Sequence, residues 1–144
     1  MKYRIRPAVT DDSAQLVILL GELGYPSTAD FILEKLTQPS STPGTKILVA
    51  DREGTVIGLL CFSIVPLLHV SGGLGRISAL VVGSQFKGRG IGKRLVAEAE
   101  ELAWENGCAR IEITSGEHRA DAHAFYQAIG YKQDSRRFIK HRPD

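Results

Sequence analysis

The sequence has few of the residues that mark a disulfide-rich, metal-binding or membrane protein. Its 144 residues include two cysteines, one methionine and one tryptophan, and it has no run of about 18 apolar residues such as a membrane-spanning helix needs. Cys61 and Cys108 lie within or beside apolar segments, which predicts reduced core residues and neither a disulfide framework nor a metal site. The charged start, MKYRIRPAVTDD, lacks the apolar core of a signal peptide. We therefore expect a cytoplasmic protein that uses no metal ion and has no membrane partner.

A strong excess of either charge is also absent. The formal net charge is +2, which argues against a general nucleic-acid binder, because such proteins usually present a broad basic face. The apolar content of 43% and the charged content of 24% are typical of a soluble globular protein. The length suits a single domain over residues 1–144 with one core.

Hydrophobic periodicity and turn residues divide the chain into strands and helices. Strands are expected over residues 3–9, 45–51, 55–65, 76–82 and 108–114, and a final strand is expected from residue 131, clearest over 137–140. Helices are expected over 14–23, from a cap at Ser27 or Thr28 to residue 36, over 90–106 and over 119–129, with a loop at 38–44. A hairpin turn is expected at 52–54, and Gly58 indicates a bulge. The order β-α-α-β-β-β-α-β-α-β predicts a mixed α/β fold with both parallel and antiparallel strands.

The stretch 85–92, QFKGRGIG, is a glycine-rich basic loop between a strand and the strongest helix. Glycines at every second position allow positive φ angles and let a ligand approach the backbone amides closely. The first N–H groups of a helix have no intrahelical partner, and the helix dipole adds partial positive charge there. Four cations surround this point, which predicts a phosphate or pyrophosphate site; they are Lys87, Arg89, Lys93 and Arg94.

Two better-known phosphate loops do not fit this stretch. A P-loop would need glycine where Lys87 stands and serine or threonine where Arg94 stands. A dinucleotide fingerprint that starts at Gly88 would need a third glycine at Lys93. A tight turn without a ligand is the alternative, but four cations would then oppose the helix dipole, so an anion among them is the favoured interpretation.

The pattern Gln85-x-x-Gly88-x-Gly90, followed by Ile91 and Gly92, resembles the acetyl-CoA-binding motif of the GNAT N-acetyltransferase superfamily. The segment 124–131, AFYQAIGY, is similar to the family's A-x-Tyr-x-x-x-Gly-aromatic segment, and the hairpin 48–58 is of a kind common in the family. The resemblance covers residues 3–140. It implies a GNAT fold, a twisted mixed sheet with helices on both faces.

The resemblance also implies how the cosubstrate, acetyl-CoA, binds. In the family, the strand that matches 79–82 splays from the strand that matches 110–114, and the pantetheine arm pairs with the first of these. The loop amides hold the pyrophosphate, and basic side chains meet the phosphates. The cofactor-binding residues expected here are Leu80, Val81, Val82, Gln85, Phe86, Lys87, Gly88, Arg89, Gly90, Ile91, Gly92 and Lys93.

The implied reaction is direct transfer of the acetyl group to a primary amine of a small molecule or peptide within a ternary complex. Tyr126 matches the family's proton donor to the CoA thiolate, and a phenol with a pKa near 10 suits that role. A half-buried aromatic on an amphipathic helix is the plainer interpretation of this residue. Neither cysteine lies in a motif, so nothing favours a cysteine acyl-enzyme.

The sequence departs from the family pattern in two places. Many members carry a carboxylate on the strand before the loop, whereas residues 77–80 contain no acid, and Ser78 can only orient a water. Arg119 stands where many members have asparagine. The general base is therefore not identified. The candidates by residue type are Glu112, Glu117, His118 and His69, and residues of these types are more often structural or surface residues than bases.

The amine substrate is also left open. Substrate specificity in the family usually comes from regions that here contain Glu22, Tyr25 and the connection 66–75 with His69. An alternative function is a non-catalytic CoA-binding or regulatory module of the same fold, which the missing strand carboxylate slightly favours and Tyr126 disfavours. A homodimer is expected from the family alone.

Overall fold

The computed structural model describes residues 1–37, 44–114, 120–134 and 138–144. The chain divides into two compact units, Met1–Thr114 and Ser115–Asp144, and each is described here by itself. The single domain expected over residues 1–144 stays a prediction. Most of the loop expected at 38–44 lies outside the described residues.

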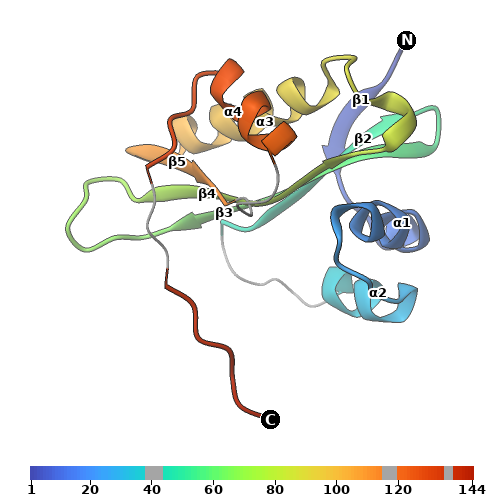
Figure 1. Ribbon diagram of the computed structural model, residues 1–144, viewed down its shortest axis with the longest axis horizontal. Helices are drawn as coiled ribbons and strands as arrows, with labels where there is room; N and C mark the ends of the chain where they lie inside the picture. Colours follow the sequence, from blue (N-terminus) through green and yellow to red (C-terminus); the bar gives the residue numbers. More distant parts are fainter. Residues whose placement is uncertain (38–43, 115–119, 135–137) are drawn as a thin grey trace. The chain divides into compact units, whose positions relative to one another are not determined.

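The first unit is built on a five-stranded sheet with the spatial order β1-β2-β3-β4-β5 (Figure 1). The first four strands pair antiparallel, and β5 pairs parallel to β4. A parallel pair needs a crossover, which α3 supplies between β4 and β5. The predicted mixed sheet is confirmed. The strands are β1 Arg4–Pro7, β2 Lys46–Arg52, β3 Thr55–Val65, β4 Leu74–Val82 and β5 Arg110–Ile113.

Helices cover both faces of this sheet (Figure 1). The first face carries α1 (Ser13–Leu23), preceded by the short 3-10 turn η1 (Thr10–Asp12), and α2 (Ala29–Thr37). Thr28 caps α2 as expected, because its Oγ1 accepts the Phe31 N–H at 3.1 Å. The buried side chains of this face include Leu16, Leu19, Ile32, Val49, Val56, Leu59 and Val81.

The second face carries α3 (Ile91–Glu105), where residues 90–106 predicted a helix. Its buried stripe is Ile91, Leu95, Val96, Ala99 and Ala103. The expected stop is confirmed, since the side-chain amide of Asn106 donates to the Leu102 carbonyl at 2.7 Å and Gly107 has φ +76°.

The hairpin between β2 and β3 contains a tight turn and a bulge, and the bulge lies beside Gly58, where α3 packs closely on the sheet. Glu53 and Gly54 both have positive φ, as a two-residue hairpin turn requires. The pairing shifts between Ala50 and Asp51 so that Ile57 is the extra residue, which confirms the bulge expected beside Gly58. A Cβ atom on Gly58 would lie 3.1 Å from Leu95 Cδ1. The missing side chain therefore lets the start of α3 pack directly on β3.

A charged triad joins β1, η1 and the hairpin. Arg6 donates two hydrogen bonds to Asp12, at 2.8 and 2.9 Å, and its Nε donates to Asp51 at 2.9 Å. Asp12 also accepts the Val9 N–H and Asp51 accepts the Gly54 N–H, each at 2.8 Å. The hydrogen bonds from Arg6 lower the pKa of both carboxyl groups. The triad thereby fixes the edge of the sheet against the start of α1.

The second unit contains α4 (Ala120–Ala128), which the segment 119–129 predicted. Gly130 follows with φ +99°, and the Tyr131 N–H bonds the Tyr126 carbonyl at 2.9 Å. The final strand expected from residue 131 is wrong for 131–134 and 138–144, which have no strand structure. Phe138 and Ile139 are consecutive in a highly charged segment and are 96% and 60% exposed, so they provide no alternating face to bury.

Candidate functional site

The candidate site begins at a bulge in β4. Cys61 pairs with Ala79 and Phe62 pairs with Ile77, so Ser78 is the extra residue on β4. Ile77 is also the last residue of β4 that pairs with β5, and its carbonyl accepts the Thr114 N–H at 3.3 Å. The strand continues to Val82 with no β5 partner in the described part of the chain. The two parallel strands are thus paired only up to the bulge, as the predicted splay requires.

Alternate residues of the unpaired segment direct their backbone polar groups to the open side of β4. Successive residues of a strand direct their N–H and C=O groups to alternate sides. The Gly83 N–H donates to the Ile57 carbonyl of β3 at 2.9 Å. By alternation, the polar backbone groups of Val82 and Leu80 point away from β3, while those of Val81 point toward it. An extended ligand beside β4 can therefore hydrogen-bond Leu80 and Val82.

The glycine-rich loop follows directly. After Gly83 the chain makes the 3-10 turn η2 (Ser84–Phe86) and then reaches α3 through two left-handed residues, Gly88 at φ +79° and Gly90 at φ +81°. Gly90 is the residue that precedes α3, and no side chain caps this end of the helix. A Cβ atom at Gly88 or at Gly90 would meet nothing within 4 Å, so the space beside both residues is open to a ligand. The positive φ predicted for these two glycines is confirmed, whereas Gly92 lies within α3.

The cations of the loop have no acidic partners among the described residues. Arg89 lies over the Phe86 ring at 5.6 Å, and its Nη1 is 3.8 Å from the Met1 sulfur. Arg94 lies over the Tyr3 ring at 5.2 Å. The side chains of Lys87 and Lys93 are exposed. Cations without a described acidic partner, beside free helix amides, provide the electrostatics that favour an anion.

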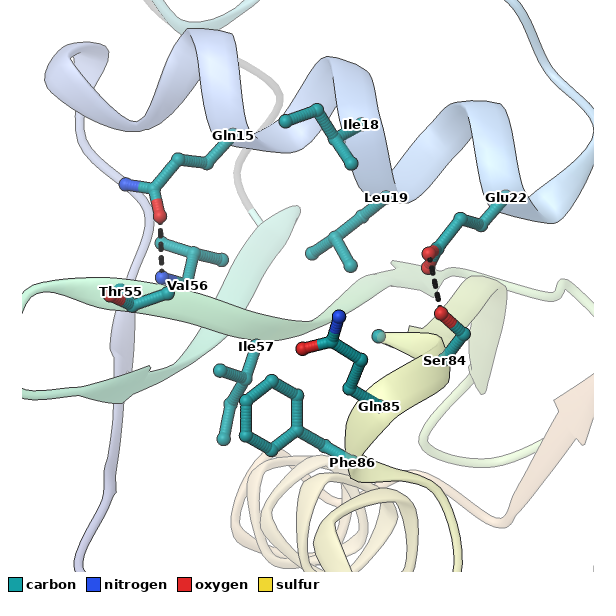
Figure 2. A pocket seen from close by; sticks show the side chains of 11 residues that line it. Gln15, Ile18, Leu19, Glu22, Thr55, Val56, Ile57, Ser84, Gln85 and Phe86 are labelled. Atoms are coloured by element: carbon teal, nitrogen blue, oxygen red, sulfur yellow. Dashed lines mark hydrogen bonds between the residues drawn. The ribbon is translucent and has the colours of Figure 1, made fainter.

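A cleft of about 250 Å³ lies between α1 and η2 (Figure 2). The Gln15 side chain accepts the Val56 N–H at 2.7 Å, and Ser84 donates to Glu22 at 3.1 Å. These bonds join α1 to the bulged start of β3 and to the segment that precedes the loop. The lining includes Gln15, Ile18, Leu19, Glu22, Thr55, Val56, Ile57, Gly83, Ser84, Gln85 and Phe86.

The structure also places three of the residues considered for the base or the substrate pocket. Glu112 lies on β5 and pairs with Arg76 at 3.6 Å and Arg110 at 3.3 Å, which accounts for it as a structural residue. His69 is exposed in the connection before β4, at the opposite end of that strand from the loop. Tyr25 follows α1 and is 63% exposed. The other candidates, Glu117 and His118, lie outside the described residues, as does Arg119.

Tyr126 lies on α4 in the second unit. Its side chain is half-buried, and its ring meets the Phe125 ring edge-on at 5.5 Å. The helical position of the family-like segment is as expected. The catalytic role of Tyr126 stays a prediction.

Sequence reasoning missed two residues near the loop. Arg52, at the end of β2, has its guanidinium 5.7 Å from the centre of the Phe86 ring. Gln15 supports the bulged start of β3 through its bond to Val56. Neither belongs to a local motif, and both contacts join segments distant in the chain, so no local signal could have identified them.

The sequence of this chain is similar to those of known acetyltransferases. Residues 18–131 match the model of the acetyltransferase (GNAT) family. An aminoalkylphosphonate N-acetyltransferase from Salmonella typhimurium is 33% identical over 141 residues, covering 94% of this chain and 89% of the relative.

Two solved structures have the same fold. A transcriptional regulator from Bacillus halodurans is 26% identical with a TM-score of 0.86, and the match covers 97% of this chain and 99% of that chain. The aminoglycoside N-acetyltransferase AAC(6')-Iy in complex with CoA is 18% identical with a TM-score of 0.84, covering 98% and 95%. The second likeness concerns the fold alone.

The match to the family extends from α1 through the glycine loop to the segment that contains Tyr126. The relative from Salmonella typhimurium matches over almost the full length of both chains. The chain therefore belongs to the GNAT family and is an acetyl-CoA-dependent N-acetyltransferase.

Proposed function

We propose that the protein transfers the acetyl group of acetyl-CoA directly to a primary amine of a small molecule or peptide, in a ternary complex. The observation that carries the proposal is the unpaired edge of β4, which leads into the open amides at the start of α3. The edge of β4 can pair with an extended ligand that contains amide groups, and the amides at the start of α3 can hold a phosphate. Acetyl-CoA contains both groups in that order.

The cosubstrate would lie along β4 with its pantetheine arm beside Leu80, Val81 and Val82. Its amides would exchange hydrogen bonds with the backbone of Leu80 and Val82. The pyrophosphate would sit on the amides that follow Gln85. The remaining contacts of this proposed site come from Phe86, Lys87, Gly88, Arg89, Gly90, Ile91, Gly92 and Lys93.

In the transfer, the neutral amine attacks the thioester carbonyl, and the C–S bond breaks as the amide bond forms. The departing CoA thiolate takes a proton from the phenol of Tyr126. The extra proton of the former amine passes to solvent, and the Tyr126 phenolate is reprotonated from solvent. Direct transfer is supported by the cysteines. Burial raises the pKa of the Cys61 thiol to about 11 and also raises the pKa of Cys108, so burial disfavours the nucleophilic thiolate form of both residues.

We propose small amines that carry an anionic group as the first substrates to test. The support is the relative named as an aminoalkylphosphonate N-acetyltransferase, which is 33% identical to this chain. The test is release of the CoA thiol from acetyl-CoA over a panel of aminoalkylphosphonates, amino sugars, aminoglycosides and peptides. CoA binding without thiol release for every amine of the panel would contradict the proposed substrates.

Replacing Tyr126 by phenylalanine tests the proposed acid. The change removes the proton donor and keeps the ring, so we expect kcat to fall about 100-fold while the Kd for acetyl-CoA changes less than about twofold. Steady-state kinetics and calorimetry measure the two quantities. Tyr131→Phe removes a hydroxyl from the same family-like segment and serves as the control. Equal losses of kcat in both variants, or equal losses of kcat and binding in Tyr126→Phe, would assign Tyr126 a structural role.

A further inference from the structure

The basic loop has a cationic neighbour, Arg52, at the end of β2. Ala50 lies on the α3 face of the sheet, because a Cβ atom on Gly58 would touch both Ala50 and the α3 residue Leu95. Side chains alternate along a strand. Arg52, two residues on, therefore lies on the same face, at the end of the sheet where α3 begins. Asp51 lies on the opposite face.

Two guanidinium groups converge on one ring there. The Arg52 Cζ is 5.7 Å and the Arg89 Cζ is 5.6 Å from the centre of the Phe86 ring. Both distances are within the range of a cation–π interaction, which restrains a long side chain without occupying its N–H donors. Phe86 thus holds one cation from the loop and one from a strand that is distant in sequence.

Neither cation is neutralised within the described ranges. Four other arginines there have a carboxylate within 4.0 Å, whereas Arg52 and Arg89 have none. Two acids flank Arg52 in the chain. Asp51 already binds Arg6 and the Gly54 N–H, and Glu53 forms no ion pair with Arg52 within 4.0 Å. Two unneutralised like charges on one ring repel each other, and an anion between or beside them would remove that cost.

We infer that Arg52 binds a phosphate group of acetyl-CoA from outside the glycine-rich loop. The inference rests on the proposed function, because it extends the proposed pyrophosphate site to a residue of the β2–β3 hairpin. The planar guanidinium presents paired N–H donors that match two phosphate oxygens. Phe86 supports Arg52 and Arg89 together and so links the hairpin to the loop.

The test compares Arg52→Gln with Arg4→Gln. Both changes remove one positive charge from an exposed side chain at this edge of the sheet. Arg4 pairs in register with Asp51, so it lies on the opposite face, and its side chain is 75% exposed. The control therefore reproduces the change in net charge without touching the α3 face. Calorimetry at fixed ionic strength would give the Kd of each variant for acetyl-CoA and for acetyl-3′-dephospho-CoA.

We expect Arg52→Gln to weaken acetyl-CoA binding about tenfold, and Arg4→Gln to change it less than about twofold. If the 3′-phosphate is the group bound, the tenfold loss disappears with the dephospho compound. If the pyrophosphate is bound, the loss is equal with both compounds, and either outcome supports the inference. An effect of Arg52→Gln no larger than that of Arg4→Gln with both compounds would overturn it. A wild-type protein that binds neither compound would instead refute the proposed function.

Discussion

Arg6 forms hydrogen-bonded ion pairs with two largely buried carboxylates of the first unit. Its guanidinium serves two carboxylates, and the side chains of Asp12 and Asp51 are only 5% and 10% exposed. Charges that are removed from water need partners, and here each carboxylate has both a charged and a backbone donor. The triad therefore depends on Arg6 more than on either acid.

Replacing Arg6 by glutamine should be strongly destabilising. The change leaves two buried carboxylates without their cation, so the free energy of unfolding should fall by about 3 kcal/mol. Urea denaturation at pH 7 measures it. Arg4→Gln removes the neighbouring exposed arginine, whose Nε lies 3.9 Å from Asp51, and should cost less than about 0.5 kcal/mol. Similar losses in the two variants would show that the triad contributes little.

The same triad should make the protein sensitive to acid. Arg6 lowers the folded-state pKa of Asp12 and Asp51 below their unfolded value, which is near 4. Their contribution to stability is therefore complete above pH 4 and is lost as the pH falls through the lowered folded-state pKa values.

Urea denaturation between pH 7 and pH 2.5 tests this linkage. The free energy of unfolding should decrease more steeply with falling pH in the wild type than in Arg6→Gln, which lacks the stabilising cation. Parallel pH dependence in the two proteins would exclude the triad as the source of acid sensitivity.

None of these residue-level partners could be predicted from the sequence. Arg6 and Asp51 are 45 positions apart, and so the contact depends on the pairing of β1 with β2. The same applies to Arg52 and Phe86. The loop itself was predictable, because its glycines and cations are contiguous in the chain and their chemistry requires no distant partner.

At the scale of elements, the close contact of α3 with β3 determines where the loop ends. Gly58 allows this approach, and the nearest atoms to an added Cβ belong to Leu95 and Ile91, in the first turns of α3. Both of these side chains are fully buried. A displacement of the helix start would therefore move two buried side chains.

A valine at Gly58 should displace the start of α3. We expect the free energy of unfolding to fall by about 2 kcal/mol through overpacking, together with weaker acetyl-CoA binding. Denaturation and calorimetry measure these effects. Gly21→Val is the matched control, because a Cβ atom at Gly21 meets nothing within 4 Å, and it should change stability by less than about 0.5 kcal/mol. If Gly58→Val binds acetyl-CoA as the wild type does, the helix start does not depend on this contact.

The elements differed in how well the sequence predicted them. The hairpin and α3 were predicted because a two-residue turn, an apolar stripe and a glycine stop are all local signals. The bulge at Ser78 was not, since it is visible only in the register between β3 and β4. The final strand was wrongly predicted from a segment whose two adjacent apolar residues have no partner surface among the described residues.

For the whole molecule, the family match spans parts of both compact units, from residue 18 to residue 131. In the part of the chain that the structure describes, no helix is long and apolar enough to span a membrane. The cosubstrate could be predicted from sequence because the motif that resembles the family's acetyl-CoA-binding loop is contiguous in the chain. The amine could not, because the residues that would select it are not gathered in one local motif.

The most direct test of the central claim compares two glycines of one helix. Gly90 precedes α3 at φ +81° and Gly107 follows it at φ +76°, and a Cβ atom at either meets nothing within 4 Å. Alanine should cost a similar backbone strain of about 1–2 kcal/mol at both positions. Only at Gly90 would it also disturb amides that we propose to hold phosphate.

Calorimetric titration of the wild type, Gly90→Ala and Gly107→Ala with acetyl-CoA separates the two effects. The predicted result is binding of similar affinity by the wild type and Gly107→Ala, and a loss of at least about tenfold in Gly90→Ala. Equal affinity in all three proteins, or no binding by the wild type, would contradict the account.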